Sequence, residues 1–121
     1  MNNQTTAEKD KLSCLEFSLK QTASIRVKSD DGRSYFFSTS HFLDGIQEAN
    51  PDLTNDAPPE RLTLRFTTGD VVMLGSSLGR VEDRLTEGTL RSLQTVAPRF
   101  VGVIRTTPVI LSIRVQRKEQ L

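Results

Sequence analysis

Residues 61–74, with the sequence RLTLRFTTGDVVML, decide the fold. In their first half, three apolar side chains alternate with Arg61, Thr63 and Arg65, which is the pattern of a half-buried β-strand. Residues 67–70 (TTGD) supply turn chemistry, and the apolar run 71–74 follows without alternation. The run predicts a second strand that is buried on both faces. The segment as a whole therefore predicts a β-hairpin inside a sheet.

A helix is predicted directly after this hairpin. Leu78, Val81 and Leu85 have the i, i+3, i+7 spacing of one helical face. Ser76 or Ser77 is the expected N-cap, because a serine hydroxyl can accept a hydrogen bond from a free amide of the first turn. Gly88 is placed to end the helix. The helix therefore covers about residues 77–87, with its apolar face toward the sheet.

Further strands are predicted on both sides of this unit. Residues 15–19 alternate, residues 24–38 form a hairpin through the turn Asp30-Asp31-Gly32, and residues 109–115 alternate as a last strand. Residues 40–50 fit a helix and a strand equally well. The spacing of three between Leu90, Leu93 and Val96 favours a second short helix, with a strand as the alternative.

The predicted fold class is α+β. It consists of a mainly antiparallel sheet of about five to six strands with one main helix (about 77–87) packed on one face. The chain has 121 residues, which fits one domain over 12–116 between a flexible tail at 1–11 and a second tail at 117–121. The proline-containing segment 51–60 is expected to be a surface loop inside this domain.

Composition and charge narrow the function classes. The net charge is +1, so no overall field would attract the protein to nucleic acid or to an anionic membrane. The first eleven residues are polar and no apolar run approaches the roughly 20 residues of a membrane span. A cytoplasmic location without membrane association is the expectation.

No catalytic or metal motif is visible. His41 is the only histidine and Cys14 the only cysteine, and no pair of cysteines has zinc-ligand spacing. Residues 75–79 (GSSLG) join a strand to a helix but lack the lysine of a phosphate-binding loop. We therefore expect neither an enzyme nor a bound cofactor or metal, and we expect His41 and Cys14 to be structural or surface residues.

Basic residues are concentrated in the last third of the chain. From Arg80 to the end, eight Lys and Arg residues stand against four acidic ones. Such asymmetry is typical of a surface that binds nucleic acid or an acidic partner. The candidate nucleic-acid-binding residues are Arg80, Arg84, Arg99 and Arg105.

The order of elements over residues 25–115 resembles the LytTR-type DNA-binding domain of bacterial regulators. The resemblance lies in residues 75–78 (GSSL) entering a helix, then Phe100, and then 105–107 (RTT) before an apolar strand. It implies DNA reading by basic residues of loops and strand ends, here Arg99 and Arg105. The chain departs from that family at 108–110 (PVI), where the family has a polar asparagine.

The function predicted from these observations is a small non-catalytic binding domain. It would act through a protein partner or through self-association, because strands with apolar faces have edges that add further chains. DNA binding is the second hypothesis. A small-ligand site near His41 is the third.

Overall fold

The computed structural model describes residues 14–52, 57–96 and 108–118. The predicted tail at 1–11 lies outside these residues, as do Arg99, Phe100 and Arg105. The described elements are β1 (Leu15–Phe17), β2 (Ser24–Lys28), β3 (Ser34–Ser38), the short 3-10 turn η1 (Thr39–His41), β4 (Phe42–Ala49), β5 (Glu60–Phe66), β6 (Gly69–Ser76), α2 (Gly79–Glu87), β7 (Leu90–Leu93) and β8 (Val109–Arg117).

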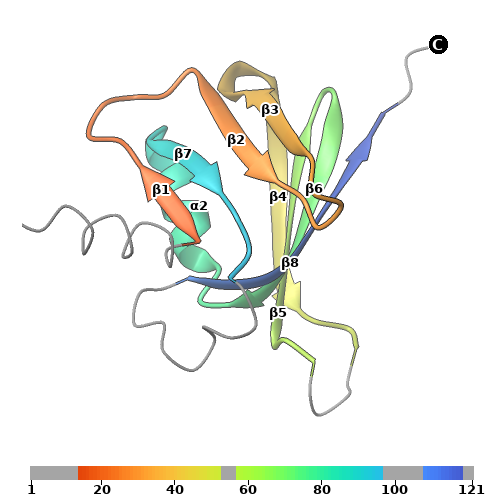
Figure 1. The fold of residues 1–121 in the computed structure, drawn as a ribbon. Coiled ribbons are helices and arrows are strands. Elements are labelled where there is room, and N and C mark those ends of the chain that lie inside the picture. Colours follow the sequence, from red (N-terminus) through yellow and green to blue (C-terminus); the bar gives the residue numbers. More distant parts are fainter. Residues whose placement is uncertain (1–13, 53–56, 97–107, 119–121) are drawn as a thin grey trace, which may run out of the picture.

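The strands form two four-stranded sheets (Figure 1). The first sheet has the order β1-β7-β2-β3, and the second has the order β4-β5-β6-β8. All pairs are antiparallel except β2 and β7, which run parallel. Parallel neighbours need a long connection. That connection runs through β3, then through β4, β5 and β6 of the second sheet, and then through α2, so the chain interleaves the two sheets into one structure.

The core lies between the two sheets. Ile25, Val27 and Phe37 face inward from the first sheet and are almost completely buried. The second sheet contributes the alternating residues that the sequence predicts, including Phe66, whose ring stacks on Phe37 at a centroid distance of 4.6 Å. The apolar sides of both sheets are thus covered mainly by each other.

Helix α2 completes this core from one side. Leu78, just before the helix, and Val81 are completely buried, and Leu85 packs against the core as a partly buried side chain. Gly88 adopts φ 75° and ends the helix, as the sequence predicts. The predicted serine N-cap is wrong, because no side-chain cap bond comes from Ser76 or Ser77.

A carboxylate from β5 takes the place of the serine cap. The amides of Ser77 and Leu78 donate to Glu60 Oε2 and Oε1 at 3.1 and 3.0 Å. The negative charge also lies at the positive end of the helix dipole. The start of α2 is therefore fixed by a residue that precedes it by almost 20 positions.

The two sheets are joined at β8. Asp30, in the β2–β3 turn, accepts hydrogen bonds from the Ser112 hydroxyl (2.8 Å) and the Ile113 amide (3.1 Å), and its own amide donates to Ile113 O (2.9 Å). Farther along the strand, Val96 N donates to Ile110 O (2.9 Å). These contacts occupy backbone groups on the outer edge of β8.

The class α+β, the antiparallel character and the main helix are confirmed, but three details besides the serine N-cap are wrong. The described residues form eight strands in two sheets, instead of five to six strands in one sheet. Residues 90–93 form a strand and not a short helix. Residues 71–74 are not buried on both faces of the strand. Val71 and Met73 are buried, whereas Val72 and Leu74 are half-buried. The open question at 40–50 is settled in favour of a strand, β4.

Candidate functional site

Two of the four predicted arginines fall within the described residues, and both lie on α2. Arg99 and Arg105 lie outside the described residues. Arg80 and Arg84 lie one turn apart on α2. Arg80 is exposed beside two carboxylates, Glu82 and Asp83, in a shallow hollow. The α2 arginines therefore do not provide a region of uniform positive charge.

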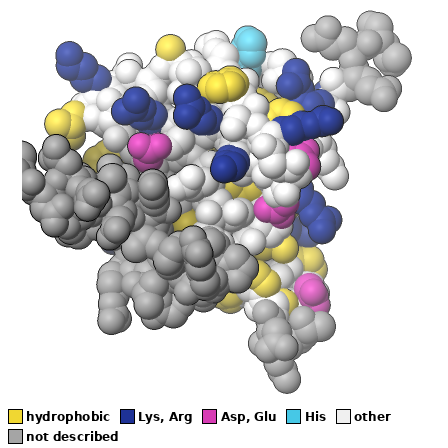
Figure 2. All heavy atoms as spheres, in the orientation of Figure 1, with side chains coloured by type: hydrophobic (Ala, Val, Ile, Leu, Met, Phe, Trp, Pro, Cys, Tyr) yellow, Lys and Arg dark blue, Asp and Glu magenta, His cyan; other side chains and the backbone are white. Residues whose placement is uncertain are grey.

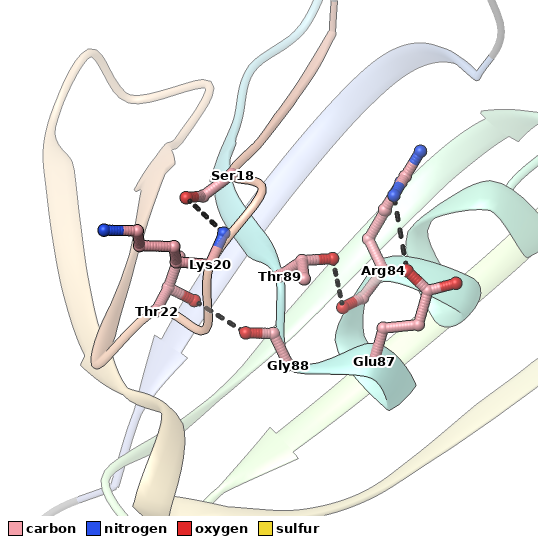
Figure 3. A network of polar contacts seen from close by, with 7 residues as sticks. All are labelled: Ser18, Lys20, Thr22, Arg84, Glu87, Gly88 and Thr89. Atoms are coloured by element: carbon pink, nitrogen blue, oxygen red, sulfur yellow. Dashed lines mark hydrogen bonds and ion pairs between the residues drawn. The ribbon is translucent and has the colours of Figure 1, made fainter.

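Arg84 has a structural role at the end of α2 (Figure 3). Its guanidinium lies 3.6 Å from the centroid of the Phe17 ring and donates a hydrogen bond to Glu87 at 3.3 Å. Its backbone carbonyl accepts a bond from the Thr89 amide at 2.9 Å. These contacts tie the helix to β1 and to the chain that enters β7. Arg84 is thus held by intramolecular partners.

The histidine and the cysteine lie in different surroundings, one exposed and the other buried. His41 is exposed at the end of η1. Cys14 is buried, and its sulfur accepts a bond from the Ile110 amide at 3.4 Å. Burial raises the pKa of the Cys14 thiol, so the sulfur stays protonated near neutral pH.

Within residues 14–52, 57–96 and 108–118, no group of three or more His, Cys, Asp or Glu side chains is arranged to hold a metal ion. No helix among those residues has the length and apolarity needed to cross a bilayer.

Strand β4 is the most unusual element of the described fold. It is an edge strand of the second sheet, and seven of its eight residues are exposed. Leu43 and Ile46 are apolar, and 56% and 49% of their surfaces are exposed. An edge strand exposed on both faces offers its backbone to another chain.

The alternation of hydrogen-bonded pairs between β4 and β5 identifies which backbone groups of β4 are free. Asn50 N donates to Pro59 O at 3.0 Å, next to the register pair Ala49 and Glu60. Bonded pairs alternate along an antiparallel ladder, so Asp44, Ile46 and Glu48 also turn their backbone groups toward β5. The residues between them, Gly45, Gln47 and Ala49, turn their amides and carbonyls outward. No described residue bonds to these outward groups.

The side chains of β4 are arranged by charge. Asp44 is paired with Arg65 through two hydrogen bonds, and this partner lowers the pKa of Asp44 below its usual range. Glu48 is paired with Arg61 at 2.8 Å. Ile46 lies between the two acids on the same face. The strand therefore presents an acid, an apolar side chain and an acid along its outer face.

An open hollow of about 650 Å³ lies at the end of β4. Its lining comes from β4, from the start of β5 and from α2: Gln47, Glu48, Ala49, Pro59, Glu60 and Glu82. The amide of Gln47 donates to Glu60 Oε1 at 3.0 Å, which links this hollow to the start of α2. The other long edge strand, β8, is instead engaged by Asp30 and Val96.

The sequence did not identify β4 as a site because its pattern fits two structures. Gly45 interrupts the apolar spacing, and Asp44 and Glu48 are spaced as on a helix face. The alternation of acid, apolar residue and acid at 44, 46 and 48 was the signal for an exposed strand.

No protein-family model, no curated protein and no solved structure matches the chain. The predicted LytTR-like layout accordingly gains no support from these comparisons.

Proposed function

We propose that this chain is a non-catalytic protein-binding domain that receives an extended segment of a partner protein at the free edge of β4. The observation that carries the proposal is the outward backbone of Gly45, Gln47 and Ala49 on an otherwise exposed strand. Three residues with one donor and one acceptor each offer up to about six main-chain hydrogen bonds, as in other cases of strand addition.

The charges of the sheet indicate the chemistry of the partner. Across the outer face, Arg65 lies between Asp44 and Asp70, and Arg61 lies next to Glu48. Opposite charges on neighbouring strands stabilise a sheet, and like charges destabilise it. A strand added beside β4 is therefore best matched when it carries Lys or Arg opposite the two acids and a β-branched residue opposite Ile46.

Self-association at this edge is less well supported. The residues of β4 include no Lys or Arg, so a second copy of β4 would provide no positive charge opposite Asp44 or Glu48 in any register. In one antiparallel register Asp44 faces Glu48 of the other copy directly. A different protein with basic and apolar residues in alternation is the better partner.

A peptide selection tests this proposal. The full chain is used to select from a random displayed heptapeptide library, and the selected peptides are measured by fluorescence polarisation. We expect enrichment of basic–apolar–basic alternation. Ala49→Pro removes an outward amide without removing a bond to β5, and it should weaken binding by about tenfold or more.

The matched control is Ala49→Thr, which keeps the amide and favours strand structure. It should bind the selected peptides as well as the native chain does. Circular dichroism establishes that both variants are folded. Equal binding by Ala49→Pro, or selected peptides without the alternation, would contradict strand addition at β4. A concentration-dependent dimer that Ala49→Pro abolishes would show instead that the occupant is a second copy.

A further inference from the structure

The outer face of the first sheet forms a second surface, separate from β4. On β2, Ile25 and Val27 point into the core, so Arg26 and Lys28 point outward. On β3, the register pairs Arg26 with Phe36, which places the Phe36 ring on the same outer face. On β7, Ser92 pairs with Arg26, and the exposed Arg91 next to it is the extra residue of the bulge in the β1–β7 pairing. We call the surface formed by these residues the basic sheet face.

Unpaired positive charge gathers on the basic sheet face. Figure 2 shows Lys and Arg side chains spread over the front of the molecule, where Figure 1 places β1, β7, β2 and β3. Arg26, Lys28 and Arg91 are exposed, and none of them forms an ion pair with a described carboxylate. The strands of this sheet carry one acid, Glu16, which accepts a hydrogen bond from the Ser92 hydroxyl at 2.6 Å.

An exposed aromatic ring lies among these charges. Phe36 has 64% of its surface exposed, and the guanidinium of Arg26 is 5.4 Å from its ring centroid. The register places Phe36, Arg26 and Ser92 in one row across three strands. A ring, a cation and a hydroxyl thus lie side by side on a flat surface.

We propose that the basic sheet face binds single-stranded nucleic acid. An unpaired base can stack on Phe36, and Arg26, Lys28 and Arg91 can bind the neighbouring phosphates. Four strands of three to five residues each, at a spacing of about 4.8 Å, form a face that holds about two to three nucleotides. The binding is therefore weak for a single domain and strongly dependent on salt.

The same observations disfavour the other anionic partners. Membrane binding needs several protruding apolar side chains near basic ones, whereas the register places one large exposed apolar side chain, Phe36, on this face. The Phe17 ring of β1 lies against Arg84 of α2 instead. In duplex nucleic acid the bases are stacked on each other, so the ring would be left without a partner. An acidic peptide would use the cations but not the ring.

The test measures anisotropy of fluorescein-labelled twelve-nucleotide oligothymidine with the full chain at several salt concentrations. Three phosphate contacts predict a slope of about −2 in a plot of log K against log salt for a single strand. Phe36→Leu keeps an apolar side chain on β3 but removes stacking, and we expect about tenfold weaker binding. Arg26→Gln combined with Lys28→Gln should weaken binding by about tenfold or more at low salt.

Arg114→Gln combined with Lys118→Gln is the matched control, because it removes the same charge from the exposed outer part of the second sheet and its end. It should leave binding within about twofold of the native chain. Three outcomes would overturn the proposal: no oligothymidine binding at low salt, equal binding by the control and the Arg26/Lys28 variant, or native affinity in Phe36→Leu. Preferential binding of duplex DNA, or of phosphatidylserine vesicles without oligothymidine binding, would also overturn it.

Discussion

Replacing Glu60 should destabilise the protein, although Glu60 lies outside the helix that it caps. In Glu60→Ala, the amides of Ser77 and Leu78 lose their acceptors, and the Gln47 amide loses its partner at 3.0 Å. Loss of a helix cap costs about 0.5–2 kcal/mol, and loss of the charge at the helix N-terminus costs about 0.3–1 kcal/mol more. We therefore expect the free energy of unfolding to fall by about 1–3 kcal/mol.

Urea denaturation followed by circular dichroism measures this change, and two kinds of control make it specific. Glu60→Gln keeps one acceptor oxygen and should cost about half as much as Glu60→Ala. Ser76→Ala and Ser77→Ala should change stability by less than about 0.5 kcal/mol, because neither hydroxyl caps the helix. If a serine variant were costly and Glu60→Ala neutral, the capping assignment would be refuted.

Three further predictions follow from local geometry. Gly75→Ala should destabilise the protein strongly, since a Cβ at this position would lie 2.1 Å from Val109 O. A Cβ at Gly79 would have no neighbour nearer than 3.9 Å, so Gly79→Ala should stabilise α2 by about 0.5–1 kcal/mol. Thermal denaturation of both variants checks this, and equal effects would contradict it. Arg65→Gln should raise the pKa of Asp44 toward its ordinary range, measured by NMR titration. Because the pKa of Asp44 is lower in the folded state than in the unfolded state, ionised Asp44 stabilises the fold above its unfolded pKa. This stabilisation is lost as the pH falls through the folded pKa. An unchanged Asp44 titration in Arg65→Gln would show that the pair does not form. Cys14 should react with iodoacetamide slowly in the native protein and rapidly in urea at pH 8, because the thiol is buried and its pKa is raised; rapid native reaction would contradict its burial.

The sequence predicts those elements whose side chains alternate between the core and solvent. Leu62 and Leu64 alternate with polar neighbours. The β5–β6 hairpin, the last strand at β8 and the end of α2 at Gly88 are all confirmed. In these segments the burial of one face decides the conformation, and the spacing of apolar residues reports that burial directly.

Elements decided by distant contacts were not predictable in the same way. Leu90 and Leu93 are spaced as on a helix, but an extra residue in the β1–β7 pairing, between Leu90 and Ser92, lets both leucines face the core from a strand. The contact that joins the two sheets, between Asp30 and β8, links residues more than 80 positions apart. The exposed face of β4 could not be located without knowing that β4 is an edge.

Amide hydrogen exchange along β4 tests the central claim most directly. In the free protein, the amides of Gly45, Gln47 and Ala49 should exchange rapidly, while those of Ile46 and Glu48 should be protected by β5. A bound peptide from the selection should slow exchange at the first three residues and leave the other two unchanged. Uniform protection of all five amides in the free protein, or no change at the first three on binding, would contradict an open edge that receives a partner strand.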